Sequence, residues 1–460
     1  MGRELEFTAS SFLQIATLEA RRGRDDPGQM FPQVNAVIND LKDLHKQRRE
    51  SSRAEPSWER QRAVYGTFRK QIAGLQTKKR KALEESLQQV SSDLSRALGD
   101  GTFEWGLARG PLRGTRETYQ VAGGPERYFS MKQLEINLRS AHQLTAPNRN
   151  RLIAQLRDSL EGKLPRYVIR TDIASFYESV PHAALTDLLA RHGGLSKTSM
   201  RLVRQLLDEW TTITGRNTGI PTGVGLSANL AEVYARQIDA AFAGDPSVHF
   251  YGRYVDDIVL VARTEAQRND SECRLTARAA ELGLVLNVSK TQRLSPSAFG
   301  GAVKKDPFDI ARPIEFLGYA LARTSGTVSV EMSTATIARY KQRLQAAFAG
   351  WAAVAQPNTG SDGLLLDRVR FLAGNTKLTN SKGRAVTGIY FNYPELSKSA
   401  VSLATLDSEL RSLITANAAS LSLGLQTRLN RVSFAQGHAQ RTYHRFRQPD
   451  LERLVAVWRG

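Results

Sequence analysis

Two adjacent carboxylates, Asp256 and Asp257, are the residues of this chain whose type and spacing most clearly permit chemistry. They end the sequence Tyr254-Val-Asp-Asp and precede the apolar residues 258–261. Apolar and β-branched residues on both sides predict two strands joined by a tight turn, with the acids at its tip. Carboxylates held at a hairpin tip are oxygen ligands suited to a divalent cation. Asp is also a common turn residue, so the pair alone is equally typical of a solvated loop.

A third carboxylate, Asp172, ends a predicted buried strand that begins at Tyr167. An aspartate after a strand often caps a helix, and taken alone Asp172 fits that structural role. Together with Asp256 and Asp257 it completes a set that could hold two Mg²⁺ ions, with Mn²⁺ as an alternative. Two such ions activate a 3′-hydroxyl and stabilise a leaving pyrophosphate in an in-line displacement.

The order of these motifs resembles that of a reverse transcriptase over about residues 125–325. Five segments carry the resemblance: Asp172 with its strand, residues 219–228, the hairpin with Asp256 and Asp257, residues 281–291, and residues 314–319. The resemblance implies an α/β right-hand polymerase with a fingers-palm core. It also implies RNA-directed DNA synthesis by nucleotidyl transfer from dNTPs.

The resemblance also assigns roles to individual residues. Asp172, Asp256 and Asp257 would be the catalytic metal ligands, joined by the backbone carbonyl of Ile173. Tyr177 would exclude ribonucleotides by its place against the sugar 2′ position; the alternatives are that Tyr177 is a core residue and that Phe176, or neither, is the gate. The residues left to contact the nucleotide are Pro221, Thr222, Gly223, Lys290 and, from the fingers, Arg149 or Arg151, for which a helix-surface position is the ordinary alternative. The primer grip would be Phe316, Leu317, Gly318 and Tyr319.

One departure from the family pattern is Thr222, where ordinary reverse transcriptases have Gln; Ala228 likewise replaces a frequent Pro. Such departures resemble the bacterial defence-associated, or abortive-infection, reverse transcriptases. Residues 370–378 and 388–392 resemble the smaller reverse transcriptase subunit of the type 3 defence system. That resemblance implies a noncoding RNA, a DNA product and a second reverse transcriptase subunit as partners, with a homo-oligomer as a further option. The alternatives are a retron- or intron-like enzyme copying a dedicated RNA, and a catalytically quiet RNA-binding scaffold.

Composition points to a polyanionic partner. The 460 residues include 64 Lys and Arg against 45 Asp and Glu, a formal charge of +19. Such an excess favours nucleic acid through phosphate neutralisation, although a basic surface is also compatible with nonspecific binding. Cys273 is the single cysteine, which excludes a disulfide framework and a cysteine zinc site. Neither a signal peptide nor an apolar membrane span is recognisable, so a bacterial cytoplasmic protein is expected.

The pattern along the chain predicts three parts. Residues 1–100 are expected to form a basic helical extension, either a solvated helix face or an RNA-binding element. Residues 101–330 are expected to hold fingers and palm, beginning with an irregular loop at 101–130. Residues 331–460 are expected to be a helical thumb-like domain; from residue 333 onward they carry 17 basic and 7 acidic residues.

Tyrosines outside the palm raise the question of priming, because some defence-associated relatives start synthesis on a protein hydroxyl. The candidates are Tyr340, Tyr390, Tyr393 and Tyr443. For each of them a core position or a stacking role against a duplex is the alternative.

Overall fold

The computed structural model describes residues 6–22, 27–54, 57–112, 114, 116–145, 148–296, 310, 312–353, 359–378 and 386–458. The chain forms two compact units, each built from two separate stretches of sequence. The first unit is Met1–Thr145 with Ser175–Tyr234, and the second is Ala146–Ala174 with Ala235–Gly460. Because each unit combines two separate stretches of the chain, the units do not test the predicted boundaries at residues 100 and 330. That division stays a prediction.

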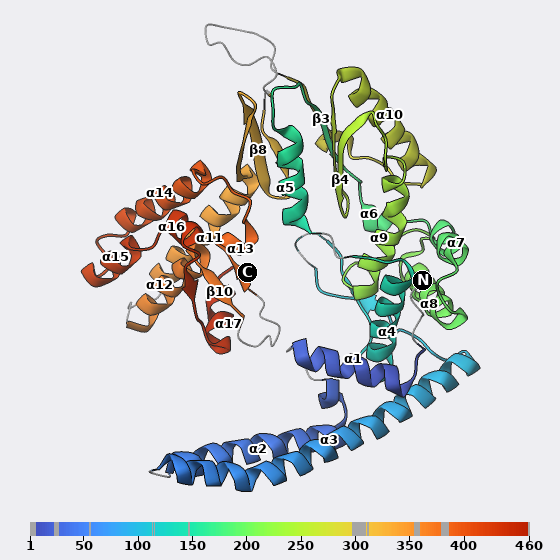
Figure 1. The fold of residues 1–460 in the computed structure, drawn as a ribbon, viewed down its shortest axis with the longest axis vertical. Coiled ribbons are helices and arrows are strands. Elements are labelled where there is room, and N and C mark those ends of the chain that lie inside the picture. The colour runs from blue at the N-terminus through green and yellow to red at the C-terminus, as the bar shows by residue number, and fades with distance from the viewer. Residues whose placement is uncertain are drawn as a thin grey trace. The chain divides into compact units, whose positions relative to one another are not determined.

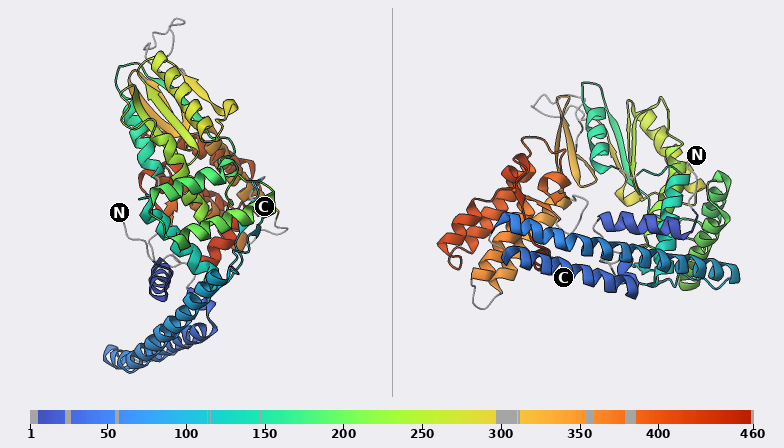
Figure 2. Two further views of the ribbon diagram at one scale, coloured as in Figure 1. Left: turned by 90° about the vertical axis from the view of Figure 1, so that its right-hand side faces the viewer. Right: turned by 60° about the horizontal axis from the view of Figure 1, so that its bottom comes forward.

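The first unit is mainly helical (Figures 1 and 2). Its elements are α1 (Ala9–Arg22), η1 (Pro27–Met30), α2 (Pro32–Ala54), α3 (Trp58–Asp100), α4 (Pro125–Ala141), α6 (Phe176–Ser179), α7 (His182–His192), α8 (Lys197–Thr214) and the start of α9 (Gly225–Asp239). The two long helices α2 and α3 run side by side as a hairpin in every view, as expected of a helical extension (Figure 2). Gly101 ends α3 at a φ of 74°, the left-handed conformation that favours glycine.

The loop expected at residues 101–130 is partly ordered. It contains a two-stranded pair, β1 (Ala108–Arg109) and β2 (Tyr119–Gln120), and α4 already begins at Pro125. The amide of Gly110 donates to the carbonyl of Thr118 at 2.7 Å, which extends the pairing. Two-residue strands have no periodicity to detect, which is why the sequence did not predict them.

The second unit holds a four-stranded antiparallel sheet of order β4-β5-β3-β6. Its strands are β3 (Tyr167–Asp172), β4 (Val248–Tyr254), β5 (Asp257–Ala262) and β6 (Gln292–Leu294). Helix α5 (Arg149–Leu160) lies against one side and α10 (Glu265–Glu281) against the other (Figure 1). Strands covered on both faces read as continuous apolar runs, which explains why β5 is so easily found in the sequence.

A second sheet in this unit joins β7 (Ile314–Phe316), β8 (Tyr319–Thr324) and β9 (Thr327–Met332). The two-residue loop Leu317-Gly318 has φ values of 50° and 79°, as hairpin turns with two left-handed residues require. Strand β9 contains the closing strand expected at residues 328–331. The remaining helices are η2 (Val288–Lys290), α11 (Thr334–Ala352), α12 (Thr359–Ala373), α13 (Ile389–Asn392), α14 (Val401–Ala416), α15 (Leu423–Asn430), α16 (Phe434–Ala439) and α17 (Gln448–Ala456).

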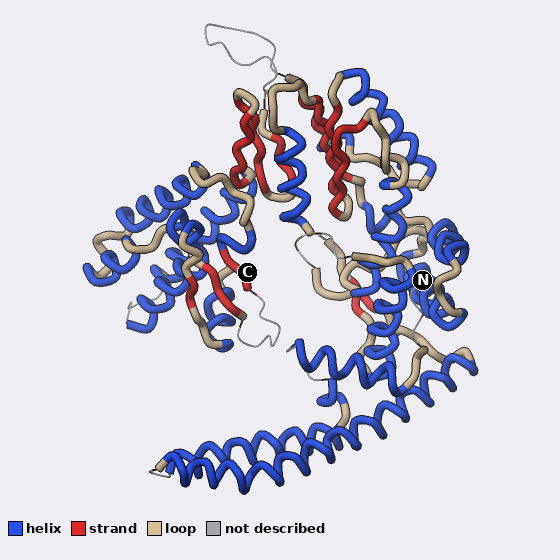
Figure 3. Tube along the Cα trace, viewed as in Figure 1, coloured by secondary structure: helices blue, strands red, loops and turns tan. Residues whose placement is uncertain are grey.

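The C-terminal region is mainly helical, as predicted, and it also contains short strands. A small sheet of order β11-β10-β12 lies among its helices (Figure 3). Its strands are β10 (Asn375–Lys377), β11 (Val386–Gly388) and β12 (Tyr443–His444). Strand β12 pairs with β10 in parallel although the two strands are far apart in the sequence, so no local sequence pattern predicts the pairing.

Asn375 ties this sheet to its surroundings. Its side chain is fully buried; Nδ2 donates to the carbonyls of Gly437 and Thr442, both at 3.2 Å, and Oδ1 accepts from the Tyr390 amide at 3.0 Å. Asn375→Ala would leave three buried backbone groups without this partner. We expect it to lower the free energy of unfolding by about 2–4 kcal/mol in urea denaturation. Asn430→Ala, at an exposed position, should change it by less than about 1 kcal/mol.

Candidate active site

The three acids predicted from the sequence come together at one end of the four-stranded sheet. Asp172 is directly opposite Asp257 in the antiparallel pairing of β3 with β5, and opposite residues project from the same face. Asp256 lies in the turn between β4 and β5. The amide of Ile173 donates to the carbonyl of Asp256 at 3.1 Å, which fastens the segment after β3 to the hairpin tip.

The hairpin tip has a strained backbone. Val255 has a φ of 59°, a conformation that β-branched residues rarely adopt. Arg253 braces it: Nη1 donates to the Val255 carbonyl at 3.0 Å, and Nε and Nη2 form a bidentate pair with Asp239 at 2.7 Å each. The sequence analysis missed Arg253, although a charged residue within an apolar strand was the available signal.

Two cations accompany the acids. Lys290 Nζ lies 2.9 Å from Asp172 Oδ2, and Arg170 Nη2 lies 2.7 Å from Asp257 Oδ1. Burial, with the charges of Asp256 and Asp172, raises the pKa of Asp257 although Arg170 opposes the shift. Arg170 was also missed; as the residue two positions before Asp172 on a strand, it had to share that face.

The donor chemistry of the acids fits Mg²⁺. Asp172 is 5% exposed, and its Oδ1 is a buried acceptor with no hydrogen-bond donor. A buried carboxylate oxygen without a donor, close to Asp256 and Asp257, is suited to binding a hard cation. Within the described ranges, no three His, Cys, Asp or Glu side chains gather closely enough to hold a metal ion. The site is therefore a set of acids partly neutralised by Lys290 and Arg170, not a closed three-ligand cage.

Of the residues predicted to contact the nucleotide, Phe176, Tyr177, Pro221, Thr222 and Gly223 belong to the first unit, whereas Arg149, Arg151 and Lys290 belong to the second. The Ile220 amide donates to the Tyr177 carbonyl at 2.7 Å, and the Tyr119 amide donates to the Thr222 carbonyl at 2.7 Å. These bonds bring Tyr177 together with Pro221, Thr222 and Gly223. Phe176 is a buried core residue and Tyr177 is half-buried, which favours Tyr177 over Phe176 as the side chain beside a bound sugar.

Gly223 shows why this loop needs glycine. Its φ is 103°, and an added Cβ would lie 2.8 Å from the Tyr119 carbonyl oxygen. The backbone of residues 219–223 is therefore held against its neighbours by contacts that a side chain would disrupt.

His182 contacts the same loop, and the sequence did not identify it as part of the site. Its Nε2 donates to the Gly219 carbonyl at 2.7 Å, and Nδ1 lies 3.3 Å from Thr211 Oγ1. Burial lowers the pKa of His182 below its ordinary value of 6.5, although the Gly219 bond and Asp208 oppose the shift.

This pKa predicts a pH dependence of stability. Because the folded pKa of His182 lies below its unfolded value, the unfolded state binds more protons as the pH falls through 6.5. The free energy of unfolding should therefore decrease on acidification below 6.5. In His182→Gln this part of the decrease should disappear in denaturation measured across that range. His192→Gln, at an exposed position, should retain the wild-type profile.

Arg149 is engaged by backbone carbonyls. Nε donates to the Leu317 carbonyl at 2.8 Å and Nη1 to the Asn392 carbonyl at 2.7 Å, while the guanidinium packs on the rings of Tyr319 and Tyr393. The triphosphate role of Arg149 stays a prediction, and in this structure the side chain holds the predicted primer-grip hairpin.

The other primer-grip and fingers residues differ in exposure. Phe316 and Tyr319 are buried core residues, with Leu317 and Gly318 forming the turn between them. Arg151, in contrast, is exposed. Arg151 is therefore open to solvent, whereas Arg149 is engaged by backbone carbonyls, and a phosphate-binding role for Arg151 stays a prediction.

The four tyrosines considered for priming divide by burial. Tyr340 and Tyr393 are buried, as the core alternative requires. Tyr390 is half-buried beneath the guanidinium of Arg441, 4.2 Å from its ring centre, and Tyr443 is exposed. The two buried side chains would have to leave the core before either hydroxyl could prime synthesis.

Comparison with known proteins agrees with this geometry. Residues 130–321 match the family described as "Reverse transcriptase (RNA-dependent DNA polymerase)". The segment includes the three acids, Lys290 and the β4-β5-β3-β6 sheet. No curated protein matches the chain. Among the described residues, no helix has the length and apolar character needed to cross a membrane.

Solved structures to which the chain is similar include telomerases. Apo telomerase from Candida tropicalis shares 13% identity over 76% of this chain and 64% of its own, with a TM-score of 0.39. Telomerase from Candida tropicalis in complex with a TWJ fragment of telomeric RNA shares 13% over 81% and 64%, with a TM-score of 0.38. The corresponding complex from Candida albicans shares 13% over 77% and 66%, with a TM-score of 0.35. The chain thus spans less than two thirds of the length of these telomerases.

The family match and the antiparallel sheet with acids at its hairpin tip lead to one assignment. Residues 130–321, which are less than half of the chain, match the reverse transcriptase family and have the α/β fold of a right-hand polymerase.

Proposed function

We propose that this chain is an RNA-directed, or non-templated, DNA polymerase that uses dNTPs with two divalent ions held by Asp172, Asp256 and Asp257. The observation that carries the proposal is the placement of Asp172 opposite Asp257, with a buried Oδ1 that has no donor. Mg²⁺, bound there, would activate a primer 3′-hydroxyl and stabilise the leaving pyrophosphate. Nucleic acid and dNTPs are the partners this requires.

The residues of the chain then have distinct tasks. Arg253 braces the hairpin tip that carries Asp256 and Asp257, whereas Asp172 is held by the pairing of β3 with β5. Lys290 and Arg170, now paired with Asp172 and Asp257, supply positive charge that can turn to phosphate oxygens. In the first unit, the loop with Gly223 offers backbone close to a nucleotide, and Tyr177 limits space at the sugar 2′ position.

The test combines metal binding with DNA synthesis. Mn²⁺ binding, followed by the loss of its free electron-spin-resonance signal, should weaken about tenfold or more in Asp172→Asn, and dNTP incorporation should fall with it. Asp270→Asn removes an equal charge at an exposed position and should leave both unchanged. Unaltered Mn²⁺ affinity in folded Asp172→Asn would remove that residue from the proposed site.

The biological setting is a further part of the proposal. Thr222 in place of the usual Gln, with the resemblance at residues 370–378 and 388–392, favours bacterial antiphage defence in the cytoplasm, with a noncoding RNA and a second reverse transcriptase. Sequencing the nucleic acid that co-purifies with the chain, and any DNA it makes, tests this. A single dedicated template RNA copied into DNA would favour the retron- or intron-like alternative.

The pairing of the acids with cations bears on the remaining alternative. A catalytically quiet RNA-binding scaffold would keep Lys290–Asp172 and Arg170–Asp257 as permanent ion pairs. In that case added Mn²⁺ should not bind with an affinity that depends on Asp172. The same binding measurement therefore separates the polymerase from the scaffold.

A further inference from the structure

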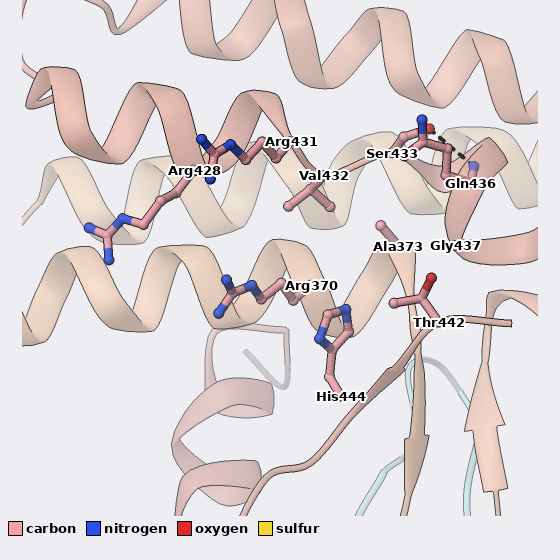
Figure 4. A pocket seen from close by; sticks show the side chains of 10 residues that line it. All are labelled: Arg370, Ala373, Arg428, Arg431, Val432, Ser433, Gln436, Gly437, Thr442 and His444. Atoms are coloured by element: carbon pink, nitrogen blue, oxygen red, sulfur yellow. Dashed lines mark hydrogen bonds between the residues drawn. The ribbon is translucent and has the colours of Figure 1, made fainter. Parts of the chain in front are cut away.

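A cavity in the C-terminal region of the second unit is lined by arginines from separate elements. It measures about 220 Å³ and is bordered by Arg370, Arg428, Arg431, Ser433 and His444, among other residues. Figure 4 shows Arg370 on one helix and Arg428 with Arg431 on and just after another, their guanidinium groups extending to the same side. These helices are α12 and α15, and His444 comes from β12.

The charge of the cavity is strongly positive. Within the part of the chain that the structure describes, neither Arg428 nor Arg431 has a carboxylate within 4.0 Å. Arg370 has one, Asp367, at 3.6 Å. Two acids lie near the three guanidinium groups: Asp367, whose pKa is raised by burial, and Asp407, which accepts from the lining Ser433 hydroxyl at 2.7 Å and from the Phe434 amide. The cavity lining still carries more positive than negative charge. An anion is the ligand that would balance this charge.

The wall that includes His444 is part of the small sheet and lies beside Arg370 (Figure 4). His444 pairs with Thr376 in the small sheet, and its ring packs so closely on Gly374 that a Cβ at Gly374 would overlap it. Burial and the charge of Arg370 lower the pKa of His444. The ring is therefore a neutral hydrogen-bonding group held in place, next to the backbone that Asn375 secures.

The lining indicates which part of a ligand is recognised. Arginine forks match phosphate oxygens, whereas a base needs an aromatic platform. Apart from His444, the residues bordering the cavity have no ring. The chain continues from His444 through the exposed Arg445 and Arg447, so positive charge extends beyond the cavity.

We propose that this cavity binds a phosphate group of a nucleic-acid strand, either a terminal monophosphate or a phosphodiester within the strand. It is a second nucleic-acid site, made of residues other than the carboxylates that carry the proposed polymerase chemistry. A variant in which Asp256 and Asp257 are replaced by Asn should therefore still bind a nucleic-acid strand at this cavity. Failure of one proposal can then be distinguished from failure of the other.

The experiment measures the binding of labelled single-stranded DNA, with a 5′-phosphate or a 5′-hydroxyl, to the full chain by fluorescence anisotropy. The test variant is Arg428→Gln with Arg431→Gln; both positions are exposed, so the fold should survive. The matched control is Lys398→Gln with Arg453→Gln, exposed positions outside the cavity that remove the same charge. Arg370→Gln is a second, independent variant. The test, control and Arg370 variants are each also prepared with Asp256 and Asp257 replaced by Asn.

The test variant should bind DNA about tenfold or more weakly, and the control less than about threefold. The slope of log affinity against log salt should become shallower by about 0.7 per lost phosphate contact. Loss confined to 5′-phosphorylated DNA identifies a terminal phosphate, and equal loss with both strands identifies an internal one. Equal weakening by test and control variants would overturn the proposal. The proposal would also be overturned if the test variant lost affinity for inorganic phosphate or a dNTP but bound the DNA strand as tightly as the wild type.

Discussion

Replacing Asp256 and Asp257 together by Asn should reduce Mg²⁺-dependent dNTP incorporation by at least about a thousandfold, or roughly 4 kcal/mol of transition-state stabilisation. Both side chains would keep their size but lose the charge that holds a divalent ion. The braced hairpin with Arg253 does not depend on either carboxylate, so the backbone at the tip should remain in place.

The stability of this double variant separates lost chemistry from lost structure. The raised pKa of Asp257 means that its ionised form is disfavoured on folding, so Asn removes a cost, while Arg170 loses its partner. Because these effects oppose each other, the free energy of unfolding without metal should change by less than about 1 kcal/mol. The control, Asp158→Asn with Asp270→Asn, removes two exposed carboxylates and should retain full incorporation. A folded double variant that still incorporates dNTPs would exclude this hairpin from the mechanism.

Tyr177→Val should relax the choice of sugar. If the ring occupies the space that a 2′-hydroxyl would need, its removal should raise the ratio of rNTP to dNTP incorporation about tenfold or more while dNTP use survives in part. Parallel single-nucleotide incorporation assays of mutant and wild type give this ratio. Tyr177→Phe retains the ring and should retain the discrimination.

Phe176 provides the contrasting case, because it is buried in the core of the first unit. Phe176→Leu should lower the free energy of unfolding by about 1 kcal/mol and leave the ratio of rNTP to dNTP unchanged. A ratio that moves with Phe176 and not with Tyr177 would transfer the gate to Phe176. An unchanged ratio in both variants would place it elsewhere.

Much of the polymerase fold could be predicted because its signals are local. Asp172 ends a short apolar strand, and Asp256 and Asp257 follow Tyr254 before another, so the chemical residues and the elements that carry them lie within a few positions of each other. Antiparallel pairing of such strands leaves few ways to arrange them, and the helices of the N-terminal extension follow from periodicity alone. The matched segment at residues 130–321 agrees with that prediction.

Other features depended on residues far apart in sequence. Lys290 meets Asp172 across 118 positions, and Arg149 reaches the carbonyl of Asn392 across 243. The sequence could suggest a functional role for Lys290 and Arg149, but it could not show which oxygen each side chain contacts. Charged residues follow no periodic pattern, and a guanidinium binds a carbonyl as readily as a phosphate.

The sequence by itself therefore determined the acids, the hairpin, the order of motifs and the excess of positive charge. The tertiary structure alone decided that Arg170 and Lys290 neutralise two of the acids, that Arg149 holds a hairpin, and that arginines of α12 and α15 share one cavity with His444. The physical reason is that strand and helix patterns repeat over a few residues. A site made by packing separate elements together leaves no such pattern in any one of them.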